Sequence, residues 1–203
     1  MNARLENGLD IRTSQVFKHP NYEPSNDWDN DFALLKLNSP VSFKKNIRPA
    51  CLPDAICDTA TEYNADTVDS CTTLTVAGWG RTEEERSPSE LRSGTLNIQP
   101  RSYCNRHFGS GTRLTLTQIC AGTGEISTCG NEFLLIIFFC FFHFLIISPG
   151  GDSGGPVTCH QEGRNYVVGT VSWGAAGCNA DGPSVFARVC HVLPWIHLTM
   201  QSN

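Results

Sequence analysis

The chain has 203 residues, of which 17% are charged, and a formal net charge of −5. This length can bury a real core in one or two domains, while the mild acidity and the lack of a basic run argue against a nucleic-acid partner. Ten cysteines predict disulfides and an oxidising compartment. Because the chain has no Cys-x-x-Cys or His-x-x-x-His pair, we expect neither a metal site nor a cofactor.

Short apolar runs between clusters of Gly, Pro, Asn and Asp predict an all-β fold. Strands are expected where Val, Leu, Thr or aromatic residues gather, at residues 32–37, 74–77, 166–173 and 184–189. Residues 46–61 are expected to form a linker and residues 83–88 an exposed loop. Residues 193–201 are expected to form one short closing helix with Pro194 near its start.

Residues 133–147 differ in composition from the rest of the chain, because His143 is their one polar residue. As a helix they would span about 22 Å, which is short for a bilayer core of about 30 Å. A spanning helix would also place Cys129 and Ser153 on opposite sides of a membrane, so a membrane partner is not expected. As a surface loop the run would expose a large apolar patch with a tendency to aggregate.

The string Gly-Asp-Ser-Gly-Gly-Pro at residues 151–156 predicts a catalytic serine. Glycines allow positive φ and a close approach of the backbone to a ligand. A serine among them can present its hydroxyl beside backbone N–H groups, which is the geometry that a nucleophile next to an oxyanion site needs. The plainer alternative is a polar turn without chemistry.

Together with five further strings in the same order, this motif resembles the chymotrypsin/trypsin-like serine protease family. The five strings are Asp-Phe-Ala-Leu-Leu-Lys-Leu at 31–37, Arg-Pro-Ala-Cys-Leu-Pro at 48–53, Gly-Trp-Gly at 78–80, Ile-Cys-Ala-Gly at 119–122 and Ser-Trp-Gly at 172–174. The resemblance implies a trypsin-like double β-barrel, with an incomplete first barrel, a complete second barrel and a short C-terminal helix. It places these parts at residues 1–50 (partial first barrel), 51–70 (interdomain linker) and 71–203 (second barrel and helix). It also implies a secreted serine endopeptidase that acts on proteins or peptides and admits protein protease inhibitors as partners.

Residue roles follow from the resemblance, position by position. It implies Ser153 as the nucleophile of an acyl-enzyme mechanism, with the N–H groups of Gly151 and Ser153 as the oxyanion hole. Asp31 would orient the catalytic histidine, and Asp152 would pair with a new N-terminal ammonium. Residues Ser172, Trp173 and Gly174 would pair with the substrate backbone as an added strand.

The resemblance also predicts the specificity pocket. With residues 131–150 skipped, Ser127 stands six residues before the nucleophile, at the pocket floor. A neutral residue there favours large apolar or aromatic side chains, and Gly174 leaves the pocket wall open. Ser184 would narrow the pocket towards smaller side chains, and Glu125 leaves a residual preference for basic ones open.

The family pattern implies four disulfides: Cys104–Cys120, Cys129–Cys178, Cys71–Cys159 and Cys57–Cys190. Cys51 stands where some family members bond to a propeptide cysteine. Cys140 lies inside the apolar run and has no family counterpart.

The chain departs from the family in its missing histidine. No Thr-Ala-Ala-His-Cys-like motif precedes Asp31, and His19 lies in a Lys-His-Pro-Asn-Tyr string that resembles a surface segment. The chain also shows no signal peptide, so it is expected to begin inside the first barrel. We expect no useful activity as written, because losing this histidine costs about 10⁶ in kcat. The alternatives are a non-catalytic homologue that acts as a binding module and a membrane-associated protein anchored through residues 133–147.

The second departure is the apolar segment itself. Removing residues 131–150 restores the family's spacing between Cys129 and Ser153. We interpret these residues as a retained intron, because T-rich codons before a splice acceptor encode Phe, Leu and Ile. A genuine hydrophobic loop and a membrane-dipping hairpin are the alternatives.

Overall fold

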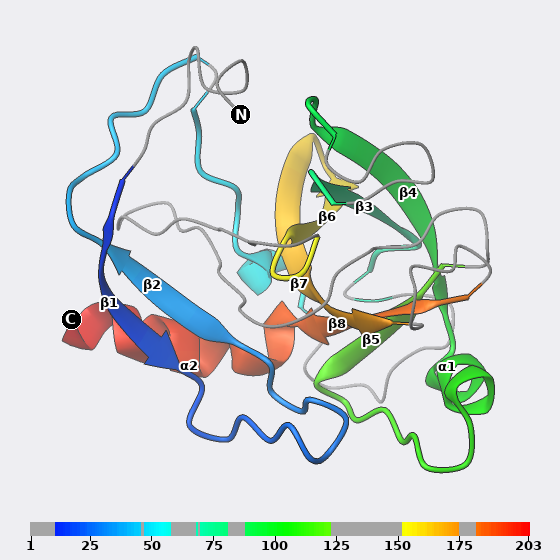
Figure 1. The fold of residues 1–203 in the computed structure, drawn as a ribbon. Coiled ribbons are helices and arrows are strands. Elements are labelled where there is room, and N and C mark those ends of the chain that lie inside the picture. Colours follow the sequence, from blue (N-terminus) through cyan, green and yellow to red (C-terminus); the bar gives the residue numbers. More distant parts are fainter. Residues whose placement is uncertain are drawn as a thin grey trace.

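The computed structural model describes residues 11–45, 47–57, 68, 70–80, 88–122, 152–174 and 182–203. Their elements form a β-barrel, a separate two-stranded ribbon and a C-terminal helix (Figure 1). In chain order they are β1 (Thr13–Lys18), β2 (Ala33–Leu37), η2 (Pro53–Ala55), β3 (Thr73–Gly78), β4 (Arg92–Gln99), α1 (Arg101–Phe108), β5 (Gln118–Ala121), β6 (Pro156–Gln161), β7 (Arg164–Gly174), β8 (Ser184–Arg188) and α2 (Val189–Ser202). The predicted mostly-β fold, with one complete barrel and one incomplete sheet, is confirmed.

The barrel closes on itself in the strand order β3-β4-β5-β8-β7-β6, with antiparallel pairs throughout. Its interior holds Leu74, Ile119 and Phe186, each with 0% of its surface exposed. Apolar side chains alternate with polar ones along β3 and β4, whereas β8 is buried at all five residues. Closure leaves the barrel without free sheet edges, so it forms a rigid base for the loops at its rim.

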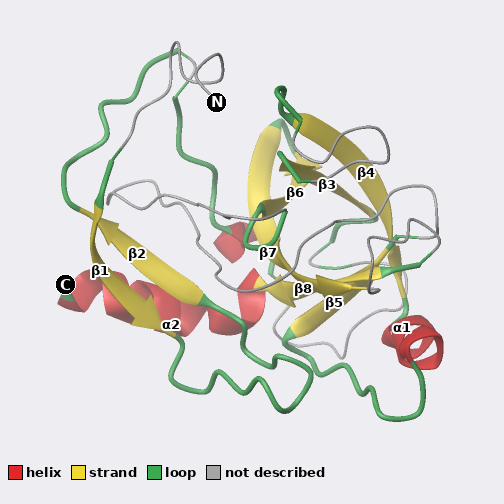
Figure 2. Ribbon diagram, viewed as in Figure 1, coloured by secondary structure: helices red, strands yellow, loops and turns green. Residues whose placement is uncertain are grey.

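The β1–β2 ribbon packs on α2, as Figure 2 shows. Val16 pairs with Leu35 across the ribbon, and β2 buries its apolar residues against the helix. The helix presents Val189, Val192, Leu193 and Ile196 as one buried stripe, which follows helical periodicity. This stripe explains why α2 begins at Val189, four residues before the predicted start, and why Pro194 lies inside the helix instead of at its first turn.

The predicted strands are present in the structure, but several further elements were not predicted. The predicted strands are present as β2, β3, β7 and β8, with ends shifted by one or two residues. The strands β1, β4, β5 and β6 and the helix α1 were not predicted, because each contains only two or three apolar side chains. The described part of the predicted linker contains η2, and all of the predicted loop at 83–88 except Pro88 lies outside the described residues.

Among the described residues, three disulfides join elements that are distant in sequence. Cys71–Cys159 links the start of β3 to β6, Cys104–Cys120 links α1 to β5, and Cys57–Cys190 links the segment after η2 to α2. These are three of the four pairs that the family pattern implies. Cys51 is a free thiol, whereas Cys129, Cys140 and Cys178 lie outside the described residues.

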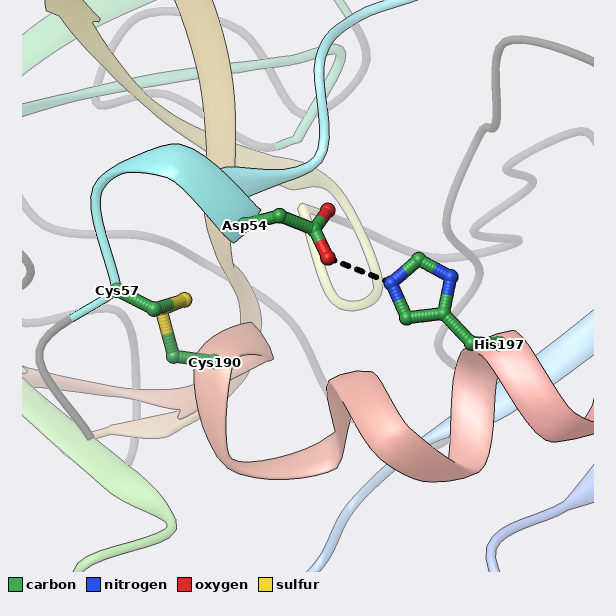
Figure 3. The surroundings of a disulfide bond; sticks show 4 residues. All are labelled: Asp54, Cys57, Cys190 and His197. Carbon is green, nitrogen blue, oxygen red and sulfur yellow. Dashed lines mark hydrogen bonds and ion pairs between the residues drawn. A yellow bond between two sulfur atoms is a disulfide. The ribbon is translucent and has the colours of Figure 1, made fainter.

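A second contact reinforces the attachment of α2 (Figure 3). The Nε2 atom of His197 lies 2.6 Å from Oδ1 of Asp54, two helical turns beyond Cys190 on the same helix. Both side chains are about half exposed, so the contact adds little free energy and serves mainly to orient the segment. In the part of the chain that the structure describes, no helix is long and apolar enough to cross a membrane.

Candidate active site

The turn that carries Ser153 depends on its glycines. Gly154 adopts φ 77° and donates its N–H to the carbonyl of Val171 at 2.8 Å, and Gly155 donates to the carbonyl of Asp152 at 2.7 Å. A Cβ at Gly155 would lie 2.7 Å from that carbonyl oxygen, which is too close for any side chain. The turn therefore holds Ser153, with 5% of its surface exposed, at the start of β6. Gly151, the other predicted oxyanion donor, lies outside the described residues.

Asp31 stands at the entrance to β2, on the ribbon rather than on the barrel. Its Oδ2 accepts a hydrogen bond from the hydroxyl of Ser172, on β7 of the barrel, at 2.6 Å. Burial raises the pKa of the Asp31 carboxyl, and the hydrogen bond from Ser172 partly offsets that rise. The carboxylate is thus held at the junction of the two sheets, at a partly desolvated position.

Two hydrogen bonds connect Ser153 to Asp31. The first is donated by the N–H of Gly154, the residue after Ser153, to the carbonyl of Val171. The second is donated by the hydroxyl of Ser172, the residue after Val171, to Asp31. The turn of the predicted nucleophile and the predicted orienting carboxylate are therefore bonded to consecutive residues of β7, and Ser172 is also the first residue of the predicted substrate-pairing edge. Asp31 and Ser172 are 141 residues apart in the sequence.

The Asp152 side chain points away from Ser153 towards the Gly-Trp-Gly string. Its Oδ1 accepts a hydrogen bond from the Gly80 N–H at 2.8 Å. A Cβ at Gly78 would lie 1.9 Å from Oδ1, and a Cβ at Gly80 would lie 2.4 Å from Oδ2. Both glycines are therefore needed to make room for this carboxylate.

The predicted substrate-pairing edge lies at the end of β7. Gly174 pairs with Ser184 of β8. A Cβ at Gly174 would lie 3.4 Å from the Ser184 hydroxyl, so these two residues lie side by side. The indole of Trp173 lies between two aromatic rings, with centroids 5.8 Å from Trp28 and 4.8 Å from Phe108. Sequence reasoning missed Trp28 and Phe108, although Trp28 stands three residues before the aspartate at position 31.

Comparisons with known proteins identify the family of the chain. A family model described as Trypsin matches residues 2–131 and 148–196. The chain belongs to the trypsin family. It is also 30% identical over 217 residues to the complement C1s subcomponent of Sus scrofa, an alignment that covers 99% of this chain and 27% of that relative. This trypsin-family chain therefore spans about a quarter of the relative's length.

The family match also bears on the apolar run. The two matched ranges leave out residues 132–147, which nearly coincide with the run at 133–147. The run itself lies outside the described residues, as do Ser127, Glu125 and the predicted Cys129–Cys178 pair. The pocket floor of this trypsin-family chain therefore stays a prediction.

The ring of His19 packs on α2, while its backbone N–H donates to the carbonyl of Phe32 at 2.8 Å. Its ring packs edge-on against Trp195 of α2, with centroids 4.7 Å apart, and its Nδ1 accepts a hydrogen bond from the Asn21 N–H. Among the described residues, the hydrogen bond to the Asp31 carboxylate comes from Ser172 and not from a histidine. Within the same ranges, no group of three or more His, Cys, Asp or Glu side chains could hold a metal ion.

The contact between the ribbon and α2 contains two histidines with lowered pKa values. Burial lowers the pKa of His19, His191 lowers it further, and Asp29 partly opposes both effects. Burial likewise lowers the pKa of His191, with Arg188 adding to the effect and Asp29 opposing it. The fold therefore favours the neutral form of both rings.

We expect the trypsin-family chain to lose stability as the pH falls from 7.5 to 5.5. In the unfolded chain a histidine titrates near its ordinary pKa of about 6.5. In the folded chain His19 and His191 have lower pKa values, so as the pH falls the unfolded chain binds protons at these two residues first. The contribution of the two neutral histidines to stability is thus fully present above about pH 6.5 and is lost as the pH falls below it. Thermal unfolding followed across this range measures the loss, and the double replacement His19→Gln/His191→Gln should flatten it. The matched control is His160→Gln, which changes an exposed residue of β6, and a slope that responds equally to this control would contradict the assignment.

Proposed function

We propose that this chain is a serine-endopeptidase domain that uses Ser153 as its nucleophile and Asp31 to orient a histidine. The observation that carries the proposal is the pair of hydrogen bonds that link the Ser153 turn to Asp31 through Val171 and Ser172. Membership of the trypsin family supports it at the level of reaction class. Proteins or peptides are the substrates that this class implies, and protein protease inhibitors are candidate partners.

In this mechanism the Ser153 hydroxyl attacks the carbonyl carbon of the scissile peptide bond. A histidine takes the hydroxyl proton and later gives it to the leaving amine, while the N–H groups of Gly151 and Ser153 stabilise the oxyanion. Asp31 accepts a hydrogen bond from the histidine and stabilises its protonated form. The partial burial of Asp31 strengthens that interaction, because the site excludes part of the surrounding water.

We further propose that the 203-residue chain does not turn over substrate as it stands. None of its six histidines stands in the family's motif, and among the described residues Ser172 donates the hydrogen bond to the Asp31 carboxylate. Without a general base, the serine hydroxyl is a weak nucleophile, and the loss is about 10⁶ in kcat. A non-catalytic binding module is the second candidate, and the same observation favours it.

The transcript distinguishes the two candidates. For an enzyme, we expect the message upstream of the Met1 codon to encode a His-Cys motif in frame, and the mature message to join codon 130 to codon 151. An upstream frame without such a histidine would favour the binding module. A mature message that retains codons 131–150 would refute the intron interpretation.

The substrate preference is tested on the enzyme that the transcript encodes. With Ser127 at the pocket floor, we expect cleavage after Phe and Leu to exceed cleavage after Arg, and Ser184 would favour small side chains such as Ala. Peptide substrates with these four residues, assayed beside a Ser153→Ala control, give the order. Preferred cleavage after Arg would refute the Ser127 assignment, and equal rates in the Ser153→Ala control would refute the nucleophile.

We also infer an extracellular location. The three disulfides of the described residues support it, because such bonds persist in oxidising compartments. The location is tested by following a tagged chain into the culture medium of expressing cells, and retention in the cytosol with reduced cysteines would contradict it.

A further inference from the structure

The loop that carries Asp31 has an unusual backbone. Asp27, Trp28 and Asn30 adopt φ values of 49°, 54° and 53°, in the left-handed region that side chains other than glycine's disfavour. Such conformations persist where the surroundings determine them. Since the strained residues immediately precede Asp31, whatever holds them also sets the position of its carboxylate.

The surroundings in question belong to the barrel. Asp29 Oδ1 accepts hydrogen bonds from the hydroxyls of Thr115, at 2.8 Å, and Thr117, both in the segment between α1 and β5. The two hydroxyls also lie 2.7 Å from each other, and the Asn30 N–H donates to the same Oδ1 atom. One carboxylate oxygen thus joins the aspartate loop to a segment 86 to 88 residues away in the sequence.

Asp27 makes a second connection to the same segment. Its backbone carbonyl accepts a hydrogen bond from Gln118 Nε2 at 2.6 Å, and its Oδ2 accepts one from the Arg113 N–H at 2.9 Å. Gln118 is 1% exposed and is the first residue of β5, so its amide is a fixed donor. The loop is therefore held on both sides of Trp28, whose ring lies beside Trp173.

Thr117, one of the two threonines that donate to Asp29, is itself held by the barrel. Thr117 is 5% exposed, and its carbonyl accepts a hydrogen bond at 2.7 Å from the N–H of Arg188, at the end of β8. Ser172 lies on β7, which pairs with β8. Asp29 is thus connected through Thr117 to β8, while Asp31 is bonded to Ser172 of β7, the strand that pairs with β8.

We propose that Asp29 is a positioning residue, which holds Asp31 opposite Ser172 by tying the aspartate loop to Thr115 and Thr117. This proposal rests on the proposed role of Asp31. The ribbon and the barrel are separate sheets, so the Ser172 hydroxyl alone would leave the carboxylate free to pivot. A displacement of about 1 Å in such a group is enough to cost about 100-fold in a catalysed rate.

The test uses the full 203-residue chain with carboxyl-labelled aspartate, and it measures the pKa of Asp31 by NMR. The replacement Thr115→Val/Thr117→Val removes both donors at nearly constant volume and leaves the Asp29 charge in place. We expect water to reach Asp31, so that its pKa moves down towards the ordinary carboxyl value. We also expect the Ser172 hydroxyl proton to exchange about tenfold faster, as in a locally opened segment.

Two controls separate positioning from general loss of stability. The replacement Thr115→Ser/Thr117→Ser keeps both hydroxyls and should leave the Asp31 pKa unchanged. Ile196→Val changes a fully buried residue of α2, so it lowers global stability without removing a hydrogen bond of the loop and should also leave the Asp31 pKa unchanged. Asp29→Asn keeps the Oδ1 acceptor, so it should preserve the slow hydroxyl exchange that Asp29→Ala loses.

An unchanged Asp31 pKa in the valine pair would overturn the proposal. An equal shift in the serine pair or in Ile196→Val would overturn it too. If the valine pair does not fold, Thr115→Val alone gives the same comparison, because Thr115 is only half-buried. The measurement needs no proteolysis, so its failure is distinguishable from a failure of the proposed enzymatic function.

Discussion

Replacing Gly80 with alanine should displace the Asp152 carboxylate and destabilise the chain by about 3 kcal/mol. The new Cβ would lie 2.4 Å from Asp152 Cγ and 2.5 Å from Oδ1, distances that require the carboxylate to move. Overpacking of this kind costs about 1–3 kcal/mol. The move also breaks the 2.8 Å hydrogen bond from the Gly80 N–H, and a bond to a charged group contributes about 1.5–3 kcal/mol.

Unfolding in urea measures this loss, and Gly111→Ala is the matched control. A Cβ at Gly111 would meet nothing within 4 Å, so this replacement tests alanine in open space. Gly78→Ala should be at least as damaging as Gly80→Ala, since its Cβ would lie 1.9 Å from Asp152 Oδ1. Equal midpoints for Gly80→Ala and Gly111→Ala would show that Asp152 does not occupy this position. Because Asp152 adjoins Ser153, the same displacement would disturb the candidate nucleophile.

Removing the Cys71–Cys159 disulfide should cost about 4.6 kcal/mol, whereas removing Cys104–Cys120 should cost about 3 kcal/mol. The first bond joins residues 88 positions apart and the second joins residues 16 positions apart. A bond that closes a longer loop removes more freedom from the unfolded chain. All four sulfurs belong to buried cysteines, so replacing each pair with alanine leaves similar small cavities.

Denaturant unfolding of the two paired variants gives the order directly. Each variant keeps the other two described disulfides, so the comparison has a common background. The reverse order would mean that loop length does not govern these bonds and that strain or residual structure in the unfolded chain does. The Cys71–Cys159 pair also matters for the site, because it joins β3, which ends at Gly78, to β6, which follows Ser153.

Much of the site could be predicted from local strings of residues. The Gly-Asp-Ser-Gly-Gly-Pro string indicated a tight turn with one serine, and the structure shows Gly154 at positive φ and Gly155 against a backbone carbonyl. The family order of the strings also indicated the disulfide partners. Such strings are informative because glycine and cysteine restrict the backbone in ways that few other residues can replace.

Other features could not be predicted, because they depend on contacts between distant segments. Nothing near Asp29 in the sequence indicates Thr115 or Thr117, and nothing near Trp173 indicates Trp28 or Phe108. The helix α1 was missed because five of its eight residues are charged or polar and Cys104 is its one buried residue. Its position comes from the bond to Cys120 and from packing on β5, which are long-range effects.

The sequence by itself indicated the family, the candidate nucleophile and the three disulfides that the described residues contain, since those depend on residues whose chemistry is restrictive wherever they occur. Only the tertiary structure decided how Asp31 is held. It showed that Ser172 donates a hydrogen bond to this carboxylate and that Asp29 ties its loop to the barrel. The physical reason is that a hydrogen bond between two sheets depends on how the sheets pack, and that packing is a property of the whole core rather than of any one segment.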